Sequence, residues 1–347
     1  MKMRLLGHSG LKVSELCLGT MTFGTETGIG ADEAECRRVF DTYVDAGGNF
    51  IDTANIYTLG TSERMLGRFM AGQRSRLVVA TKYALATEPR DPNSGGNSRK
   101  ALREALDASL KRLGTDYIDL YWVHSFDAWT PIEETLRALD DAVRAGKVLY
   151  TGFSNVPAWV ISRAQTLAEC RDWTRFVALQ LHYSLIERNV ERELLPCAAS
   201  LGMTVTAWSP LAGGLLSGKY AQDPSARRHD DGRLTSTGWG NLFFKDRNLA
   251  IAATVRAEAE RLGRSPASVA IRWLLERPGG VIPILGARTA AQLRDLLSAS
   301  EFTLDPAARE ALEAASRIDM GYPRSLLEGN AGRRMQHGER DGEIIGR

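Results

Sequence analysis

Short apolar runs alternate with amphipathic stretches along most of the chain. Eight runs resemble strands buried on both faces, at residues 16–18, 49–51, 77–81, 117–123, 148–151, 176–179, 204–207 and 281–283. Between them apolar residues recur at helical spacing, most clearly over 99–113, where Leu102, Leu106 and Leu113 share one face. Strands that alternate with helices indicate a parallel sheet, and eight such units indicate a closed barrel. The pattern therefore predicts an α/β fold, the (β/α)8 TIM barrel.

Both ends of the chain depart from this alternation. Residues 3–6 and 11–13 flank a turn between Gly7 and Gly10, which predicts an N-terminal β-hairpin that plugs the bottom of the barrel. The last residues are rich in glycine and charge, and such a tail either folds over the barrel mouth or stays mobile. We predict a single domain over residues 1–347, with the hairpin at 1–13, the barrel at 14–317 and the tail at 318–347.

Composition narrows the choice of partner. The 347 residues include 44 basic and 42 acidic ones, for a net charge of +2, so there is no bulk electrostatic attraction to nucleic acid or to a membrane. The N-terminus leads into polar residues with no long apolar stretch, so we expect neither a signal peptide nor a membrane span. The four cysteines are Cys17, Cys36, Cys170 and Cys197, and they form no CxxC pair. This favours reduced thiols in a cytoplasmic protein. The expected partner is a small molecule, and the oligomeric state is open.

Four polar residues follow consecutive predicted strands. Asp52 and Tyr57 follow the second strand, Lys82 ends the third and His124 follows the fourth. Strand ends of this kind gather at the carboxyl face of a barrel, where active sites form. A tyrosine alone, with a pKa near ~10, transfers protons poorly at neutral pH, but a neighbouring ammonium stabilises its phenolate. A carboxylate can hold that ammonium, and a histidine can hydrogen-bond a carbonyl oxygen beside the phenol.

These residues lie within motifs that resemble those of the aldo-keto reductase family. The motifs follow the family's order across most of the chain: Leu18-Gly19-Thr20-Met21, Asp52-Thr53-Ala54 with Tyr57, Ala80-Thr81-Lys82, Asp119-Leu120-Tyr121 with His124, Gly152-Phe153-Ser154-Asn155, Gln180, and Trp208-Ser209-Pro210-Leu211 with Gly213. The resemblance implies reversible reduction of an aldehyde or ketone. It makes Tyr57 the proton donor, has Lys82 with Asp52 tune the phenol, and has His124 orient the carbonyl oxygen.

No GxGxxG fingerprint of a Rossmann fold follows a strand. The resemblance implies instead that NADPH binds across the barrel mouth. Ser154, Asn155 and Gln180 would hydrogen-bond the nicotinamide carboxamide, and Trp208 would stack on the ring. The other expected contacts around the nicotinamide and pyrophosphate are Gly19, Thr20, Met21, Asp52, Ser209, Pro210, Leu211, Ala212, Gly213, Leu215 and Lys219.

The adenosine end of the expected site lies after the eighth strand. Gly286, Arg288 and Gln292 open a helix there, and an arginine at a helix N-terminus suits the 2′-phosphate of NADPH. Arg233, in the long loop 212–246, is expected to reach the same phosphate. Many relatives place a carboxylate and an asparagine after that glutamine, whereas this chain has Asp295 and Leu296, so one adenine contact is expected to be missing.

Two other classes of function fit the sequence less well. A metal-dependent hydrolase needs clustered ligands, and five scattered histidines with no His-x-His argue against it, so we predict no metal. A regulatory module resembling the β-subunits of voltage-gated potassium channels would share the Trp-Ser-Pro-Leu segment. That group lacks histidine at the position of His124, which favours a working reductase. His182 has no second ligand nearby and is interpreted as a pocket wall or a hydrogen-bonded surface residue.

The physiological carbonyl is not predictable, because substrate contacts are expected from loops that vary on one scaffold, chiefly residues 22–31, 85–97, 126–130 and the C-terminal tail. Five aromatic residues suggest an aromatic-lined pocket for aldehydes, ketones, sugars or polycyclic compounds: Phe23, Tyr83, Phe126, Trp129 and Trp239.

Overall fold

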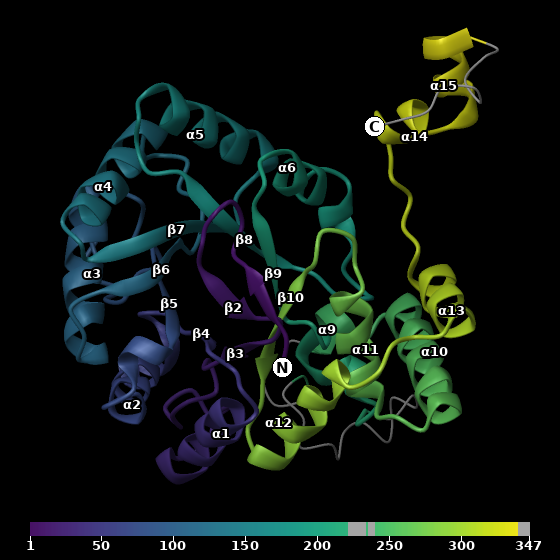
Figure 1. Cartoon of the computed structure of the whole chain (residues 1–347), viewed down its shortest axis with the longest axis horizontal. Coiled ribbons are helices and arrows are strands. Elements are labelled where there is room, and N and C mark those ends of the chain that lie inside the picture. Colours follow the sequence, from purple (N-terminus) through teal and green to yellow (C-terminus); the bar gives the residue numbers. More distant parts are fainter. Residues whose placement is uncertain (221–233, 235–239, 339–347) are drawn as a thin grey trace.

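Eight parallel strands close into a barrel. The structure is a computed structural model that describes residues 1–220, 234 and 240–338. The strands pair in the order β10-β3-β4-β5-β6-β7-β8-β9, which confirms the predicted (β/α)8 TIM barrel (Figure 1). Their bounds are β3 Cys17–Gly19, β4 Phe50–Asp52, β5 Val78–Tyr83, β6 Ile118–Val123, β7 Val148–Ser154, β8 Phe176–His182, β9 Thr204–Trp208 and β10 Ile282–Gly286.

The predicted N-terminal hairpin is confirmed. β1 (Met3–Leu5) pairs antiparallel with β2 (Lys12–Ser14). Leu6 and Val13 belong to the apolar cluster inside the barrel, and in Figure 1 the hairpin crosses the centre of the strand ring. Gly7 has a φ of +55°, and a Cβ there would lie 2.1 Å from the carbonyl oxygen of Val177, so only glycine fits this close approach. The hairpin therefore covers the amino end of the barrel and leaves the carboxyl end for the site.

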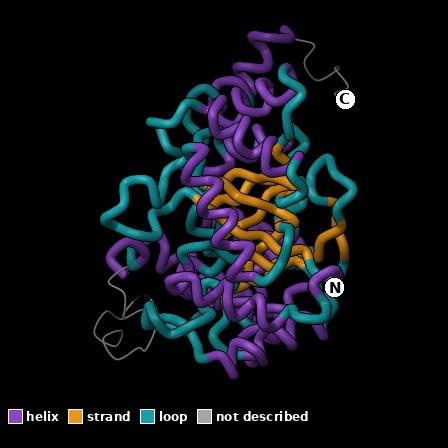
Figure 2. The backbone as a smooth tube through the Cα atoms, turned by 90° about the vertical axis from the view of Figure 1, so that its left-hand side faces the viewer, coloured by secondary structure: helices purple, strands orange, loops and turns teal. Residues whose placement is uncertain are grey.

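Helices surround the strands, as Figure 2 shows from the side. The helix predicted over 99–113 is α3, whose N-terminal amide of Ala101 donates to the Ser98 hydroxyl and whose chain leaves through Gly114 at a φ of +61°. The helical bounds are α1 Glu33–Asp45, α2 Thr61–Phe69, α3 Arg99–Leu113, α4 Ile132–Arg144, α5 Ala158–Cys170, α6 Leu194–Ser200, α9 Gly240–Phe243, α10 Asp246–Leu262, α11 Pro266–Leu275, α12 Ala290–Leu297, α13 Pro306–Ser316, α14 Arg324–Leu327 and α15 Asn330–His337. The 3-10 turns are η1 Tyr57–Gly60, η2 Arg74–Arg76, η3 Asn189–Glu191, η4 Ala212–Ser217 and η5 Ser298–Ser300.

Alternation along the strands separates two apolar layers. Trp122 belongs to the cluster inside the barrel, whereas its neighbours Tyr121 and Val123 belong to the cluster between strands and helices. Tyr83 also faces the helices and stacks on Tyr121 at 5.1 Å between ring centroids. Lys82 precedes Tyr83 on β5 and pairs in register with Trp122 on β6. It therefore turns its ammonium toward the barrel axis, as Trp122 turns its ring.

The C-terminal tail extends away from the barrel. In Figure 1, α14 and α15 lie beyond the helices that surround the barrel, and an extended segment joins them to α13. Figure 2 shows the same end of the chain from the side. The Arg192 guanidinium donates to the carbonyl oxygen of Asp319 at 2.8 Å, and Arg324 donates to that of Glu191. These contacts hold the start of the tail to the loop after β8. The division of the chain into hairpin, barrel and tail as one domain stays a prediction.

Two features of the described residues bear on partners. No helix there combines the length and apolarity that a membrane crossing requires. No three His, Cys, Asp or Glu side chains within those same ranges are grouped so as to hold a metal ion.

Candidate active site

The four predicted catalytic residues meet at the barrel mouth. Asp52 ends β4, Tyr57 begins η1, Lys82 lies near the end of β5 and His124 follows β6. Asp52 and Lys82 come from adjacent strands whose register pairs Asp52 with Ala80. Parallel strands bring their carboxyl ends to one face, so residues far apart in the sequence become neighbours.

Lys82 lies at the centre of this group. Its fully buried ammonium donates to Asp52 Oδ2, to the carbonyl oxygen of Thr53 at 2.7 Å and to the Tyr57 hydroxyl at 3.2 Å. Burial alone lowers the pKa of Lys82, but the charge of Asp52, then Tyr57, and the hydrogen bonds to both outweigh it, so the pKa is raised. Lys82 is therefore an ammonium at neutral pH, aimed at the phenol oxygen.

His124 stands beside the phenol. Its ring is nearly perpendicular to that of Tyr57, with centroids 6.1 Å apart. Burial, and to a smaller extent the charge of Lys82, lower the pKa of His124 to about 3. Its buried Nδ1 has no hydrogen-bond partner among the described residues. The imidazole is therefore neutral at pH 7, and it can donate one hydrogen bond from its protonated ring nitrogen.

Gln180 makes a contact that the sequence did not indicate. Its amide Nε2 donates to Asp52 Oδ1 at 2.9 Å, on the carboxylate oxygen that Lys82 does not use. Both oxygens of Asp52 thus accept from buried donors, which fixes the carboxylate and, through it, the ammonium. Gln180 also lines the cavity described next.

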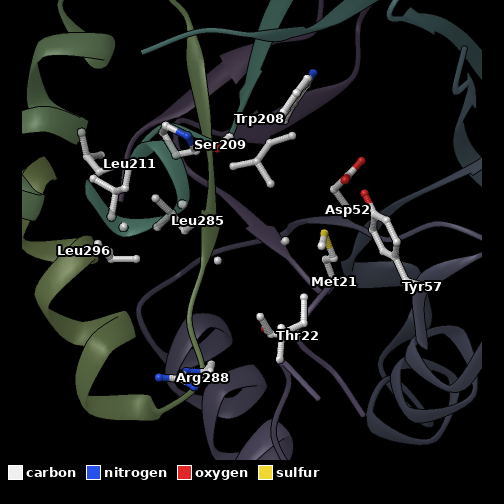
Figure 3. A pocket seen from close by; sticks show the side chains of 18 of the residues that line it. Met21, Thr22, Asp52, Tyr57, Trp208, Ser209, Leu211, Leu285, Arg288 and Leu296 are labelled. Atoms are coloured by element: carbon white, nitrogen blue, oxygen red, sulfur yellow. The ribbon is translucent and has the colours of Figure 1, made fainter. Parts of the chain in front are cut away.

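A cavity of about 630 Å³ opens from these residues along the barrel mouth. Figure 3 shows Asp52 and Tyr57 on one side of it and Arg288 and Leu296 on the other. Most of the residues predicted to be catalytic or to bind the cofactor line this cavity: Gly19, Met21, Asp52, Tyr57, His124, Ser154, Asn155, Gln180, Trp208, Ser209, Pro210, Leu211, Gly213, Lys219, Gly286, Arg288 and Gln292.

Three described residues that were expected to contact the cofactor are not in this lining. The hydroxyl of Thr20 faces Ser62 Oγ at 2.8 Å, and the side chains of Ala212 and Leu215 are buried in the protein. Arg233 lies outside the described residues. Their roles as cofactor contacts stay predictions.

Unusual backbone conformations shape two parts of the cavity wall. Asn155 has a φ of +52°, and its amide donates to the carbonyl oxygen of His124 at 2.9 Å, which ties β7 to the loop that carries His124. Ser209 and Ala212 have φ values of +53° and +51°, and Gly213 follows at +67°. This left-handed path turns the chain sharply after β9 and lays the 209–214 segment along the cavity.

Sequence reasoning missed much of the apolar lining. The lining residues that the sequence did not single out lie in core-like runs or in loops whose path it did not indicate: Ile56, Gly214, Ser217, Phe243, Ala267, Ile271, Ile284 and Leu285. Asp295 and Leu296, singled out at the adenine end, also line the cavity. Thr22, Ile29 and Leu85 also line the cavity, and they belong to the loops 22–31 and 85–97 that the sequence predicts as substrate loops. No described residue of the C-terminal tail lines the cavity.

The expected aromatic lining is wrong for the four residues that the structure describes. Phe23 is buried against Phe69 at 6.0 Å, and Tyr83 faces the helices because side chains alternate along β5. Phe126 packs on Trp159, and Trp129 is 96% exposed. Trp239 lies outside the described residues. Among the residues that the structure describes, the aromatic rings lining the cavity belong to Tyr57, His124, Trp208 and Phe243.

Comparison with known proteins agrees with this geometry. The family model described as "Aldo/keto reductase family" matches residues 15–317. The chain is 42% identical over 319 residues to the uncharacterized oxidoreductase YrpG of Bacillus subtilis, which covers 88% of this chain and 93% of that protein.

Two fungal relatives carry more specific names. The chain is 33% identical to the aryl-alcohol dehydrogenase [NADP(+)] of Phanerodontia chrysosporium, over 92% of this chain and 86% of that one. It is 35% identical to the norsolorinic acid reductase of Aspergillus flavus, over 93% and 83% of the two chains. With the barrel, the group around Lys82 and the family match in agreement, the protein belongs to the aldo/keto reductase family and is an NAD(P)H-dependent oxidoreductase.

Proposed function

We propose that this enzyme reduces an aldehyde or ketone with NADPH, reversibly, and that Tyr57 donates the proton. The observation that carries the proposal is the position of the Lys82 ammonium, which contacts both the Asp52 carboxylate and, at 3.2 Å, the Tyr57 hydroxyl. Tyr57 belongs to the cavity wall, so a ligand in the cavity would meet a phenol whose hydroxyl already contacts the ammonium.

The donor set of the cavity fits NADPH. At the Tyr57 side, Ser154, Asn155 and Gln180 offer hydrogen-bonding groups suited to a carboxamide, and Trp208 offers an aromatic surface. Farther along the wall Lys219 and Arg288 supply the positive charge that a pyrophosphate and a 2′-phosphate require. When bound, NADPH supplies a hydride for transfer to a carbonyl carbon.

The protein's own residues would handle the charge that develops on the carbonyl oxygen. Tyr57 gives its hydroxyl proton to that oxygen, and the adjacent Lys82 ammonium stabilises the phenolate that remains. Asp52 keeps the ammonium charged in its buried position. Neutral His124 donates a hydrogen bond to the same oxygen and fixes the direction from which the carbonyl approaches.

An aryl carbonyl is the substrate class that we favour. Ile29, Ile56, Leu85 and Phe243 make much of the remaining lining apolar, and none of them can pair with a charged substituent. The relatives named for an aryl alcohol and for norsolorinic acid support the same class.

The test is a panel of aldehydes and ketones assayed by loss of NADPH absorbance, with NADH in parallel. We expect aromatic aldehydes to be reduced with higher kcat/KM than short aliphatic or anionic ones, and NADPH to be preferred. A protein that binds NADPH tightly but turns over no carbonyl on the panel would contradict the proposed function and favour the regulatory class of barrel.

A further inference from the structure

One aromatic residue next to the cavity has no part in the chemistry above. His182 ends β8 and pairs in register with Trp208 at the end of β9. The two rings are stacked, with centroids 4.1 Å apart and planes 10° from parallel. Phe243 approaches the imidazole edge-on, at 6.5 Å and 74°. His182 is thus enclosed by two rings that both line the cavity, while it does not line the cavity itself.

The imidazole is not anchored through its outer nitrogen. His182 Nε2 is buried and has no hydrogen-bond partner in the part of the chain that the structure describes, and the same holds for Trp208 Nε1. The contact between the rings is therefore one of packing and stacking. Burial lowers the pKa of His182 and outweighs the opposite effect of Glu187, so the ring is neutral at pH 7. A neutral imidazole can lie flat on an indole without a charge to desolvate.

Because His182 covers one face of the indole from outside the cavity, only the remaining surface of Trp208 is available to a ligand. An indole at the end of a strand, followed by the left-handed turn at Ser209, would otherwise be free to change rotamer. The stacked imidazole restricts that freedom, and Phe243 packs against the imidazole in turn.

We propose that His182 is a positioning residue, which holds the Trp208 ring in the orientation that receives the nicotinamide end of the cofactor. The inference rests on the proposed function, because it takes Trp208 as a cofactor contact. It gives His182 no contact with cofactor or substrate and no proton to transfer. What it predicts is coupling: the effect of His182 on cofactor binding passes through Trp208.

The test is a double-mutant cycle read by NADPH binding, with the cofactor's own fluorescence as the signal. His182→Ala should weaken NADPH binding about threefold to tenfold, the range expected for one aromatic pair. In a Trp208→Ala background the same substitution should change binding less than about twofold, because no indole remains to be held. His182→Phe, which restores a flat ring, should recover most of the lost affinity.

A matched control is available on the barrel rim. Phe126 packs against Trp159 with centroids 6.1 Å apart, and neither ring lines the cavity, so Phe126→Ala should leave NADPH binding unchanged. Circular dichroism and thermal unfolding of each variant report whether the barrel is intact.

Three results would overturn the inference. They are wild-type affinity in His182→Ala, an equal loss in the Trp208→Ala background, and no recovery in His182→Phe. The proposed function fails separately, by absence of carbonyl reduction in the wild type, since the cycle needs cofactor binding alone.

Discussion

Replacement of Asp52 by asparagine tests the buried charge pair at the base of the site. Asp52 and Lys82 are both almost fully buried, with side chains 3% and 0% exposed. Asp52→Asn keeps the shape but removes the charge, and it offers one carbonyl oxygen to two donors, Lys82 Nζ and Gln180 Nε2. The new amide NH2 therefore faces one of these two donors, and the ammonium keeps the Thr53 and Tyr57 oxygens but loses its counter-ion.

The cost follows from the burial. Leaving one charge of a buried pair uncompensated destabilises a protein by about 3–5 kcal/mol, a large share of the ~5–15 kcal/mol that holds a typical domain folded. The exposed pair Arg37–Asp41, with side chains 48% and 43% exposed, is the matched control, and Asp41→Asn should cost less than about 1 kcal/mol.

The pH dependence should change sign as well. In the wild type the raised pKa of Lys82 means that its contribution is complete below the unfolded pKa near ~10.4 and is lost only at higher pH. Without Asp52, burial, the largest single influence, would lower that pKa. The unfolded state would then bind the proton more tightly, so the stability of Asp52→Asn should rise with pH up to ~10.

Urea unfolding at pH 6, 7.5 and 9 measures both effects, with Asp52→Asn/Lys82→Met as a further variant that removes both charges. That double variant should be more stable than Asp52→Asn yet still inactive. A loss below about 1 kcal/mol in Asp52→Asn, or a double variant that is less stable than the single one, would refute the reasoning about the buried pair.

Three further outcomes are expected. Arg288→Ala should weaken NADPH binding about tenfold to a hundredfold and NADH binding far less, by fluorescence titration; equal losses would show that Arg288 does not bind the 2′-phosphate. Gly152→Ala should lower stability by about 1–3 kcal/mol in thermal unfolding, because the new Cβ would lie 2.3 Å from the Trp122 ring, whereas Gly10→Ala, with open space around it, should not. The pKa of His124 is about 3 in the folded state and near ~6.5 in the unfolded state, so the unfolded state takes up a proton first as the pH falls. The wild type should therefore lose about 2 kcal/mol of its free energy of unfolding between pH 7 and pH 5 from this group. His124→Gln should lack that part of the pH dependence, and an unchanged dependence in urea unfolding would contradict the buried neutral imidazole.

The strand and helix periodicity was sufficient to predict the barrel, and the order of the strand ends was sufficient to bring Asp52, Lys82 and His124 together. The sequence could not indicate that Gln180 donates to Asp52, because the contact joins strands on different sides of the barrel and depends on side-chain length and rotamer. Nor could it distinguish aromatic residues that face the cavity from those that face the helices. Tyr83 shows the reason: a one-residue shift along β5 separates the ammonium of the site from a ring in the outer core.

The apolar lining was missed for a related cause. Ile271 and Ile284 lie in runs that also pack the core, and only the positions of α11 and β10 in space show which of their side chains border the cavity. The sharp turn after β9 and the start of η4 depend on left-handed residues such as Ser209 and Ala212, which no periodic pattern signals.

The most direct test of the account is Tyr57→Phe, measured for NADPH binding and for single-turnover reduction of an aromatic aldehyde. The variant keeps the ring beside His124 and removes only the hydroxyl that the Lys82 ammonium contacts. The account predicts near wild-type NADPH affinity and reduction slower by at least about a hundredfold, within the ~10²–10⁴ that a positioned general acid contributes. Full turnover in Tyr57→Phe would contradict the assignment of Tyr57 as the proton donor.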